Sequence, residues 1–350
     1  MSNYSEFISN KKFLITGGAG SVGQALVDRL VEEDVDVIRM LDNHEPGLSR
    51  LKSKHDDERL RFLLGDVRDK DRLGRAMQDI DVVIHTAAMK HVDISEYNPF
   101  EAVKTNVVGL QNVVDTAIDS TATRLVFTSS DKSVHPANTM GTTKLLGEKL
   151  VAAGNKYSGR SDLNLASVRF GNVLGSSESV VPLFREQIRD GGPVTLTDER
   201  MSRFFITERG ISDLVLEAAT STRGGEVFLH EMSAARIECL AESMIEILAP
   251  QHGYDPEDID IEIVGRRVGE TLHEKVMTER EAARAVKKGS IYAIPPEKGS
   301  DGYLSHEGLD SYEPPGKIVR SSEQAESSPV RKSPHFSNER GCAEWPRPSS

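Results

Sequence analysis

The amino-acid sequence predicts an α/β protein with a doubly wound parallel sheet and a smaller, discontinuous C-terminal lobe. A short apolar run, Lys12–Thr16, ends at a glycine-rich turn, which is typical of a buried strand. Similar apolar runs then alternate with segments of helical periodicity over the first half of the chain. Such alternation places parallel strands in one sheet with helices on both faces.

The expected elements follow one another in a regular order as far as Arg169. The strands are short and apolar, and the helices carry apolar residues three or four positions apart. Strands are expected at residues 12–16, 35–41, 60–64, 81–85, 124–128 and 164–169, and helices at residues 24–33, 69–78, 102–118 and 139–153.

After Gly171 the alternation loosens, and from about Glu297 onward Ser, Pro, Gly and Glu dominate. The last stretch has no sustained apolar face, so burial cannot offset its ordering entropy. Residues 176–203 have loop and helix character, helices are expected at 208–221 and 234–248, and strands at 226–230 and 259–264. We expect a main domain of residues 1–171 and 206–231, a second lobe of residues 172–205 and 232–296, and a largely irregular tail of residues 297–350.

Charge and composition exclude several classes of protein. The formal net charge is −12, whereas non-specific nucleic-acid binding needs a basic surface. No apolar run reaches the ~18 residues that span a bilayer, and the polar stretch Met1–Asn10 is not a secretory signal. Cys239 and Cys342 stand in no metal-ligand spacing. We expect a cytoplasmic protein without a nucleic-acid partner, a membrane partner or a metal.

A glycine-rich turn joins the first strand to the first helix, with glycines at 17, 20 and 23. Gly17 allows a tight turn, Gly20 lets a pyrophosphate approach the backbone, and Gly23 lets helix and strand pack closely. Ser21 and Val22 then open the helix, whose N–H groups face the phosphates. The context is that of a Rossmann-type dinucleotide site. A glycine-rich turn without a ligand is the plainer alternative.

The second strand ends in an acidic residue that favours NAD over NADP. Asp42 can accept a hydrogen bond from the adenosine ribose and repel a 2′-phosphate, and Asn43 follows it. Arg39 and Arg50 are near in sequence and act in the opposite direction. After the third strand, Asp66 and Val67 are expected beside the adenine. Asp66 could equally cap a turn or helix.

A second constellation follows the fifth strand. Thr128–Lys132 ends that strand, and Met140 and Lys144 lie on the next helix. Their i, i+4 spacing places Met140 and Lys144 on one helix face. A thioether cannot exchange a proton, so Met140 contributes only shape. Asp131 and Lys132 are the ionisable groups that follow Ser130.

Together these motifs resemble the extended short-chain dehydrogenase/reductases, and within them the UDP-N-acetylglucosamine 4,6-dehydratases of the CapD-like polysaccharide-biosynthesis family. Members of the superfamily carry a tyrosine where this chain has Met140, so the site is either broken or rebuilt around another proton-transfer group. The resemblance covers about residues 11–296. It is carried by Thr16–Gly23, Ala87–Val92, Glu96–Asn106, Ser130–Lys132, Arg169–Ser177, Met201–Phe205 and Gly269-Glu270.

The chain departs from the family pattern at three positions. Methionine replaces tyrosine at 140, a substitution that also occurs in the larger, membrane-bound branch of the family, and Asp42-Asn43 is similar to that branch too. Asp93 stands where the family usually has proline, and Thr271 where Gly-Glu is usually followed by lysine. The last two positions concern loop detail.

The resemblance implies an NAD-dependent reaction that oxidises the sugar at C4, eliminates water across C5 and C6, and returns the hydride to C6. The product is a UDP-4-keto-6-deoxy sugar for surface polysaccharide or glycan synthesis. Asp131 is then the acid at the C6 oxygen and Lys132 the base at C5, made neutral because the nicotinamide and Lys144 lower its pKa. Lys144 would bond the nicotinamide ribose and Ser130 the sugar. An exposed ion pair and a surface lysine are the plainer alternatives.

The resemblance also implies the remaining contacts. Ala87 and Ala88 would line the cofactor, and Lys90 would reach the sugar or the diphosphate, while His91 is expected to be structural. Asn172 would hold a phosphate or the N-acetyl group. The second lobe would supply Arg203, Arg267 for the diphosphate (with Arg266 as the competing assignment) and Glu270 for the uridine ribose; a solvated charge cluster is the alternative. A UDP-sugar and further copies of the chain are the expected partners.

Two other functions stay open. A sugar 4-epimerase would use the same fold, but it needs a titrating tyrosine and no C5 base, so Met140 and Lys132 disfavour it. A non-catalytic NAD-binding regulator would explain the missing tyrosine but not the retained Ser130, Asp131, Lys132 and Lys144. The sequence does not decide the configuration at C5, the acceptor of the O4 proton or the precise sugar.

Overall fold

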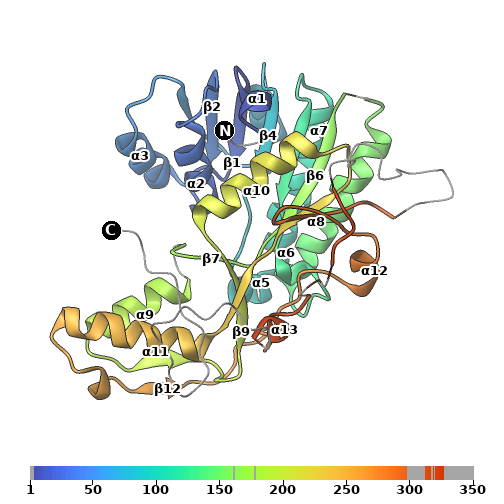
Figure 1. The fold of residues 1–350 in the computed structure, drawn as a ribbon. Coiled ribbons are helices and arrows are strands. Elements are labelled where there is room, and N and C mark those ends of the chain that lie inside the picture. The colour runs from blue at the N-terminus through green and yellow to red at the C-terminus, as the bar shows by residue number, and fades with distance from the viewer. Residues whose placement is uncertain are drawn as a thin grey trace.

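A mostly parallel sheet forms the centre of the molecule (Figure 1). The computed structural model describes residues 4–160, 162–176, 179–297, 312–316, 318 and 320–326. Within these residues the sheet has the strand order β13-β14-β10-β6-β5-β4-β1-β2-β3, with antiparallel pairing only at β10–β14 and β14–β13. Its strands are β1 (Lys12–Thr16), β2 (Val37–Asp42), β3 (Leu60–Leu64), β4 (Val82–His85), β5 (Arg124–Thr128), β6 (Asn164–Arg169), β10 (Val227–His230), β13 (Val286–Lys288) and β14 (Ile291–Ile294). The predicted α/β fold is confirmed.

Side chains of the central strands alternate between two apolar cores. In β1, Phe13 and Ile15 face one core while Leu14 faces the other, and all three are fully buried. This is the period of two that strand geometry imposes. The first core is closed by α1 (Ser5–Ile8), α2 (Ser21–Leu30), α3 (Glu45–Lys54) and α10 (Glu208–Ser221), and the second by α4 (Lys70–Ala76), α7 (Leu110–Ile118) and α8 (Thr139–Tyr157). Both faces of the sheet are therefore covered, which explains its continuous apolar strands.

The helix expected at 102–118 is interrupted. It consists of α6 (Pro99–Val103), a π-helical segment η1 (Lys104–Gly109) and α7, after the short α5 (Val92–Tyr97). Asn106, buried within η1, accepts a hydrogen bond from Met89 N at 2.8 Å and donates to Met89 O at 3.0 Å. It also donates to Thr143 Oγ1 on α8 at 2.9 Å. The π-bulge thus fixes the loop after β4 against α8, as such bulges often do near functional sites.

The second lobe has its own apolar core and lies apart from the main sheet (Figure 1). It contains β8 (Val194–Leu196) paired with β12 (Ile261–Ile263), the helices α9 (Val180–Arg189) and α11 (Ile237–Leu248), and a sheet of β11 (Ser233–Arg236), β9 (Ser202–Ile206) and β7 (Asn172–Val173). Residues 234–236, expected to be helical, instead form β11. Pairing of β11 with β9 outweighs the helix propensity of Ala234 and Ala235.

Part of the tail expected at 297–350 docks on the protein. Tyr312 is buried, and Glu313 forms a backbone bridge with Lys287. Val276 N donates to Arg320 O at 2.9 Å, and α13 (Ser322–Glu326) begins with a fully buried serine. The rest of the predicted irregular tail lies outside the described residues. The docked segment therefore contributes buried contacts that composition alone did not indicate.

Two truncations test whether the docked segment, the described tail residues 312–316, 318 and 320–326, stabilises the protein and whether the residues after it do so too. Removing everything after Pro334 should leave the melting temperature unchanged, because the described contacts of Tyr312 and Ser322 are retained. Removing everything after Pro296 deletes those contacts and should lower the melting temperature by about 5 °C or more. Differential scanning calorimetry compares the two variants, and a large drop for the shorter truncation would show that the final residues also pack.

Candidate active site

The glycine-rich turn between β1 and α2 has the tight geometry that its sequence predicts. Gly17 has a φ of +73°, and a Cβ there would lie 2.5 Å from Ala87 N. A Cβ at Gly23 would overlap Gly17 O. At Gly20 a Cβ would meet only Gly17 O, at 3.3 Å. Gly17 and Gly23 are therefore packed closely against other backbone, whereas a Cβ at Gly20 would have Gly17 O as its one neighbour within 4 Å among the described residues.

This turn fits the pyrophosphate of a dinucleotide. Gly20 is the N-cap residue of α2, and among the described residues no side chain caps that helix end. The positive end of the helix dipole at this turn favours an anion. The lack of a side chain at Gly20 allows the close approach that a phosphate requires. Ser21 and Val22 form the first turn of α2, as expected.

The acidic ends of β2 and β3 are organised by backbone hydrogen bonds. Asp42 accepts from Ala19 N and from His44 N, both at 2.9 Å, which joins it to the glycine turn. An ionised carboxylate offers about four acceptor sites, so two remain for ribose hydroxyls. Asn43 donates to Asp66 at 3.2 Å. The hydrogen bond from Arg68 lowers the pKa of Asp66.

The segment after β5 forms a short 3-10 helix, η2 (Asp131–Ser133), whose first side chain is fully buried. Asp131 Oδ1 accepts hydrogen bonds from Ser130 Oγ at 2.9 Å and from Lys132 Nζ at 3.1 Å. Asp131 Oδ2 is buried and has no hydrogen-bond partner among the described residues. Burial raises the pKa of Asp131, and the negative charge of Glu274 raises it further. A carboxyl group in this state is suited to hold and deliver a proton.

Lys132 lies between two carboxylates. Its Nζ is 3.1 Å from Asp131 Oδ1 and 3.5 Å from Glu274 Oε1, and its side chain is 19% exposed. Burial alone would lower the pKa of Lys132, but Asp131 and Glu274 outweigh burial and raise it. The expected lowering of this pKa by Lys144 and a bound nicotinamide stays a prediction, and it would have to outweigh these two negative neighbours.

The lysine whose pKa is lowered is Lys144 on α8. Burial lowers its pKa to about 8. Its Nζ donates to Thr128 O at 2.8 Å and lies 4.8 Å from the centre of the Phe127 ring. His85, at the end of β4, is also fully buried, and burial together with Lys144 lowers its pKa to about 3. Met140 is buried one turn before Lys144, as the spacing predicts.

Helix α8 approaches η2 closely because residue 141 is glycine. A Cβ at Gly141 would overlap Lys132 O. Asn138 caps the helix, with its Oδ1 accepting from Gly141 N at 2.8 Å and its Nδ2 donating to Gly269 O at 2.9 Å. One side chain thus connects the start of α8 to the second lobe.

A buried network of ion pairs and hydrogen bonds contacts the segment that contains η2. Arg169 NH2 is 2.7 Å from Glu148 Oε2 on α8 and 3.1 Å from Glu281 Oε1 near the C-terminal end of the lobe. Glu148 Oε1 also accepts from Ser129 and Ser133, on either side of Ser130–Lys132. Although burial raises the pKa of Glu281, Arg169 lowers it to about 2. The network fixes the backbone that carries Asp131 and Lys132.

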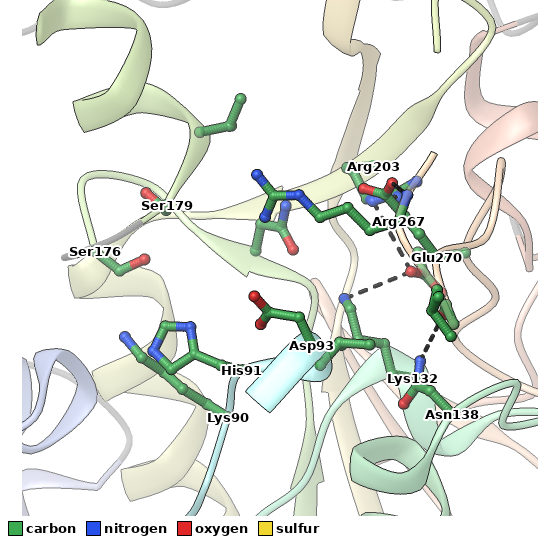
Figure 2. A pocket seen from close by; sticks show the side chains of 16 residues that line it. Lys90, His91, Asp93, Lys132, Asn138, Ser176, Ser179, Arg203, Arg267 and Glu270 are labelled. Atoms are coloured by element: carbon green, nitrogen blue, oxygen red, sulfur yellow. Dashed lines mark hydrogen bonds and ion pairs between the residues drawn. The ribbon is translucent and has the colours of Figure 1, made fainter. Parts of the chain in front are cut away.

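A cavity of about 300 Å³ opens between the carboxyl edge of the main sheet and the second lobe. Figure 2 shows Lys90 and His91 on one side, Arg203, Arg267 and Glu270 on the other, and Asp93 and Lys132 between them. Its lining contains every residue expected to bind the substrate and one of the expected catalytic residues: Lys90, Asn172, Arg203, Arg267, Glu270 and Lys132. The other expected catalytic residues, Ser130, Asp131, Met140 and Lys144, are not among its lining residues, although Asp131 contacts Lys132.

The arginines of the second lobe are held differently. Arg203 is buried and donates to Thr271 O at 2.9 Å and Leu272 O at 3.0 Å, so its guanidinium is fixed by backbone. Arg267 is exposed at the cavity, and its backbone N–H donates to Glu270 Oε2 at 3.1 Å. Arg267 is therefore the more adaptable of the two cations.

Sequence reasoning missed Glu274. It lines the cavity, is buried, and lies within ion-pair distance of Lys132 and Arg203. Although burial raises its pKa, Lys132 and Arg203 lower it. The only signal in the sequence was its position four residues after Glu270 in a region of loose periodicity, which predicts nothing specific.

Comparison with known proteins identifies relatives over most of the chain. A family described as polysaccharide biosynthesis protein matches residues 13–296. An uncharacterized membrane protein of Methanocaldococcus jannaschii is 46% identical, over 85% of this chain and 89% of its own length. A UDP-N-acetylglucosamine 4,6-dehydratase (inverting) of Campylobacter jejuni is 37% identical, covering 82% and 84%. A UDP-glucose 4-epimerase of Rickettsia prowazekii is 35% identical, covering 82% and 83%.

Solved structures with the same fold point to the same group of proteins. Pen from Bacillus thuringiensis superimposes with a TM-score of 0.82 at 36% identity, covering 91% of this chain and 94% of that chain. DesIV from Streptomyces venezuelae, a dTDP-glucose 4,6-dehydratase solved with NAD and TYD bound, has a TM-score of 0.67 at 25% identity, covering 75% and 86%.

No helix in the part of the chain that the structure describes is both long and apolar enough to cross a bilayer.

Substitution of Gly20 should separate cofactor binding from folding. Gly20→Val adds a Cβ whose one close neighbour is Gly17 O at 3.3 Å, so the melting temperature should fall less than in Gly23→Val, whereas bound dinucleotide should be lost. Cofactor content is measured in the supernatant of the denatured protein. Gly23→Val is the matched control, because a side chain there overlaps Gly17 O and should destabilise the fold itself. Full cofactor content in Gly20→Val would show that the turn is not the binding site.

Removal of Arg169 tests the buried network. Arg169→Met leaves Glu148 and Glu281 without their cation, so the free energy of unfolding should fall by about 3–5 kcal/mol. Urea denaturation at neutral pH measures the change. Arg189→Met, which removes an exposed cation beside Asp190, should change the free energy by less than about 1 kcal/mol. Equal effects of the two substitutions would mean that the network is not a stabilising unit.

Proposed function

The chain belongs to the polysaccharide biosynthesis protein family, and from this premise we propose that it is an NAD-dependent UDP-N-acetylglucosamine 4,6-dehydratase. Its relatives are nucleotide-sugar dehydratases and epimerases of the extended short-chain dehydrogenase/reductase superfamily. The proposed product is a UDP-4-keto-6-deoxy-N-acetylhexosamine, formed with loss of one water. The observation that carries the choice of reaction is Lys132 at the cavity, in contact with the buried Asp131, together with methionine at position 140 of α8.

The chain's residues suit NAD at the glycine turn. Gly17, Gly20 and Gly23 would admit the pyrophosphate, and Asp42 would accept from the adenosine ribose through its remaining acceptor sites. The adenine and the ribose–diphosphate linker of the cofactor would be lined by Val67, Ala87 and Ala88. Lys144 would bond the nicotinamide ribose. When bound, NAD⁺ supplies the hydride acceptor, taking the hydride from C4 and returning it to C6.

The protein's own groups would move the protons. Neutral Lys132 would remove the C5 proton, which the C4 ketone acidifies, and would return a proton to C5 at the end of the cycle. Protonated Asp131 would deliver its proton to the C6 hydroxyl as the C6–O bond breaks, so that water leaves. Over one cycle the enzyme gains one proton from O4 and gives up one proton to the departing water, so it regains its starting protonation state. Asp131, Lys132 and water are the candidates to accept the O4 proton, since Met140 does not titrate.

The cavity's charges fit a nucleoside diphosphate sugar. Arg267 and Lys90 would bind the diphosphate oxygens, for which a guanidinium is a strong partner. Glu270 would accept from the uridine ribose, and Asn172 would contact a phosphate or the N-acetyl group. Ser130 would hold a sugar hydroxyl beside Lys132. The shared position of Lys90, Asn172, Arg267 and Glu270 around one cavity supports their roles, and the hydrogen bond from Ser130 to Asp131, next to Lys132, supports the role of Ser130.

The second candidate is a sugar 4-epimerase, which the Rickettsia relative favours by name. Epimerisation at C4 requires no C5 base and no acid at C6, so it would leave Asp131 and Lys132 without a function. It also requires a group that titrates at O4, where this chain has Met140. A non-catalytic NAD-binding protein would leave the same buried ionisable groups unexplained. The dehydratase accounts for them with the fewest additional assumptions.

One incubation distinguishes these functions. The purified protein is mixed with UDP-N-acetylglucosamine in D₂O and followed by mass spectrometry and NMR. A dehydratase yields a product lighter by one water, with deuterium at C5, whereas an epimerase yields an isomer of unchanged mass. Recovery of unchanged substrate would contradict both enzymatic functions. The coupling constants of the product then give the configuration at C5.

Two substitutions test the assigned roles. Met140→Leu should keep measurable turnover, because a volume-conserving apolar swap costs less than ~1.5 kcal/mol. Lys132→Ala should lower turnover by about 10²–10⁴-fold, because it removes a positioned base. Initial rates of product formation provide the measurement. Retained deuterium exchange at C5 in Lys132→Ala would mean that another group is the base.

A further inference from the structure

We propose that Glu274 is a positioning residue that sets the charge state of Lys132, and that the docked C-terminal segment holds it in place. This inference rests on the proposed function only for its catalytic consequence. The assignment begins from geometry. Glu274 is 6% exposed and lines the cavity beside Lys132, and its carboxylate lies 3.5 Å from Lys132 Nζ. It acts through the lysine, on the side opposite Asp131.

The docked C-terminal segment holds the backbone of Glu274 through Ser322, which is itself bonded to β9. The backbone N–H of Glu274 donates to Ser322 Oγ at 3.0 Å, and Ser322 N donates to its carbonyl at 2.9 Å. Ser322 Oγ also hydrogen-bonds with Ser202 Oγ, at 2.7 Å, on β9. The docked segment therefore clamps the backbone on both sides of the carboxylate. A glutamate fixed in this way has little freedom to turn away from Lys132.

Glu274 is one of two carboxylates that contact the Lys132 ammonium group, and it is the one that lines the cavity. Asp131 faces the ammonium from η2 and Glu274 from the lobe, while Arg203 on β9 opposes them with its Nε 3.9 Å from Glu274. Lys90, Asp93, Arg267 and Glu270 also line the cavity. Asp131 is fully buried, whereas Glu274 borders the space where a ligand would bind. Glu274 is thus the negative partner of Lys132 that a ligand can approach directly.

A consequence for the reaction follows from the sign of this interaction. Lys132 must be neutral to take a C5 proton, and a negative neighbour stabilises its protonated form. Glu274 therefore holds Lys132 as an ammonium ion and shifts the onset of its basicity to higher pH. Without this charge, Lys132 should lose its proton at lower pH. The rising limb of the pH–rate profile should move with it.

The ionisation of Lys132 can be measured without catalysis. Trace acetylation by acetic anhydride, followed by mass spectrometry of the peptide containing Lys132, gives the pH at which this amine becomes reactive, with exposed Lys52 as an internal reference. In Glu274→Gln the midpoint for Lys132 should fall by roughly one to three pH units. Glu274→Asp keeps the charge at a greater distance and should show a smaller decrease. Should Glu274→Gln unfold, Glu274→Met removes the same charge and should give the same shift.

The control is Glu270→Gln. It removes a carboxylate from the same cavity whose ion-pair contact is with Arg203 at 3.8 Å, so the midpoint of Lys132 should stay at its wild-type value. A wild-type midpoint in both Glu274→Gln and Glu274→Met would overturn the inference. So would an equal decrease in Glu270→Gln.

The pH dependence of kcat/KM completes the test. In Glu274→Gln the rising limb should shift to lower pH by the same amount as the acetylation midpoint, whereas a purely structural role would lower the rate at every pH without a shift. If the wild type forms no product, the proposed function fails, but the acetylation midpoints still decide the role of Glu274. If the wild type is active and the limb does not move, the inference fails alone.

Discussion

The contact of Arg169 with Glu148 and Glu281 is the interaction on which the candidate site depends. Burying three charged groups costs several kcal/mol for each ion unless geometry and hydrogen bonds offset it. Here the guanidinium meets a carboxylate on α8 and another on the short helix Glu279–Ala282, and Glu148 also accepts hydrogen bonds from Ser129 and Ser133. The backbone of Ser130–Lys132 is thereby fixed at both ends. The network joins β6, α8 and this short helix next to the segment that carries Asp131 and Lys132.

The surroundings of Lys144 and Lys132 explain why their pKa values shift in opposite directions. Lys144 is buried beside the Phe127 ring and a backbone carbonyl, and burial lowers its pKa. Lys132 stands at the cavity between two carboxylates, which raise its pKa. Two lysines only twelve positions apart thus have opposite shifts because their nearest neighbours differ. In the proposed dehydratase, this difference would separate the lysine that binds the cofactor from the lysine that moves a proton.

The second lobe contributes the remainder of the cavity through loops rather than regular elements. Arg203 lies on β9. The other charged residues of this side, Arg267, Glu270 and Glu274, lie between β12 and α12 (Glu279–Ala282), where turns and backbone hydrogen bonds set their positions. The C-terminal segment then packs against this stretch through Ser322. Loops held by a rigid scaffold are the usual location of groups that select a ligand. The lobe is therefore the part of the molecule in which substrate preference would reside.

The sequence by itself determined the parallel α/β fold, the glycine turn and the grouping of Ser130, Asp131, Lys132 and Lys144, because these depend on local periodicity and short spacings. It also indicated the lobe residues that border the cavity, through their resemblance to a family. Tertiary structure alone decided the π-helical interruption at Asn106, the strand at 233–236, and the docking of Ser322. It alone placed Glu274 beside Lys132, where this carboxylate raises the pKa of the lysine. The reason is physical: a pKa depends on charges within a few ångströms, and one of the two carboxylates in contact with Lys132 is 142 positions away in the chain.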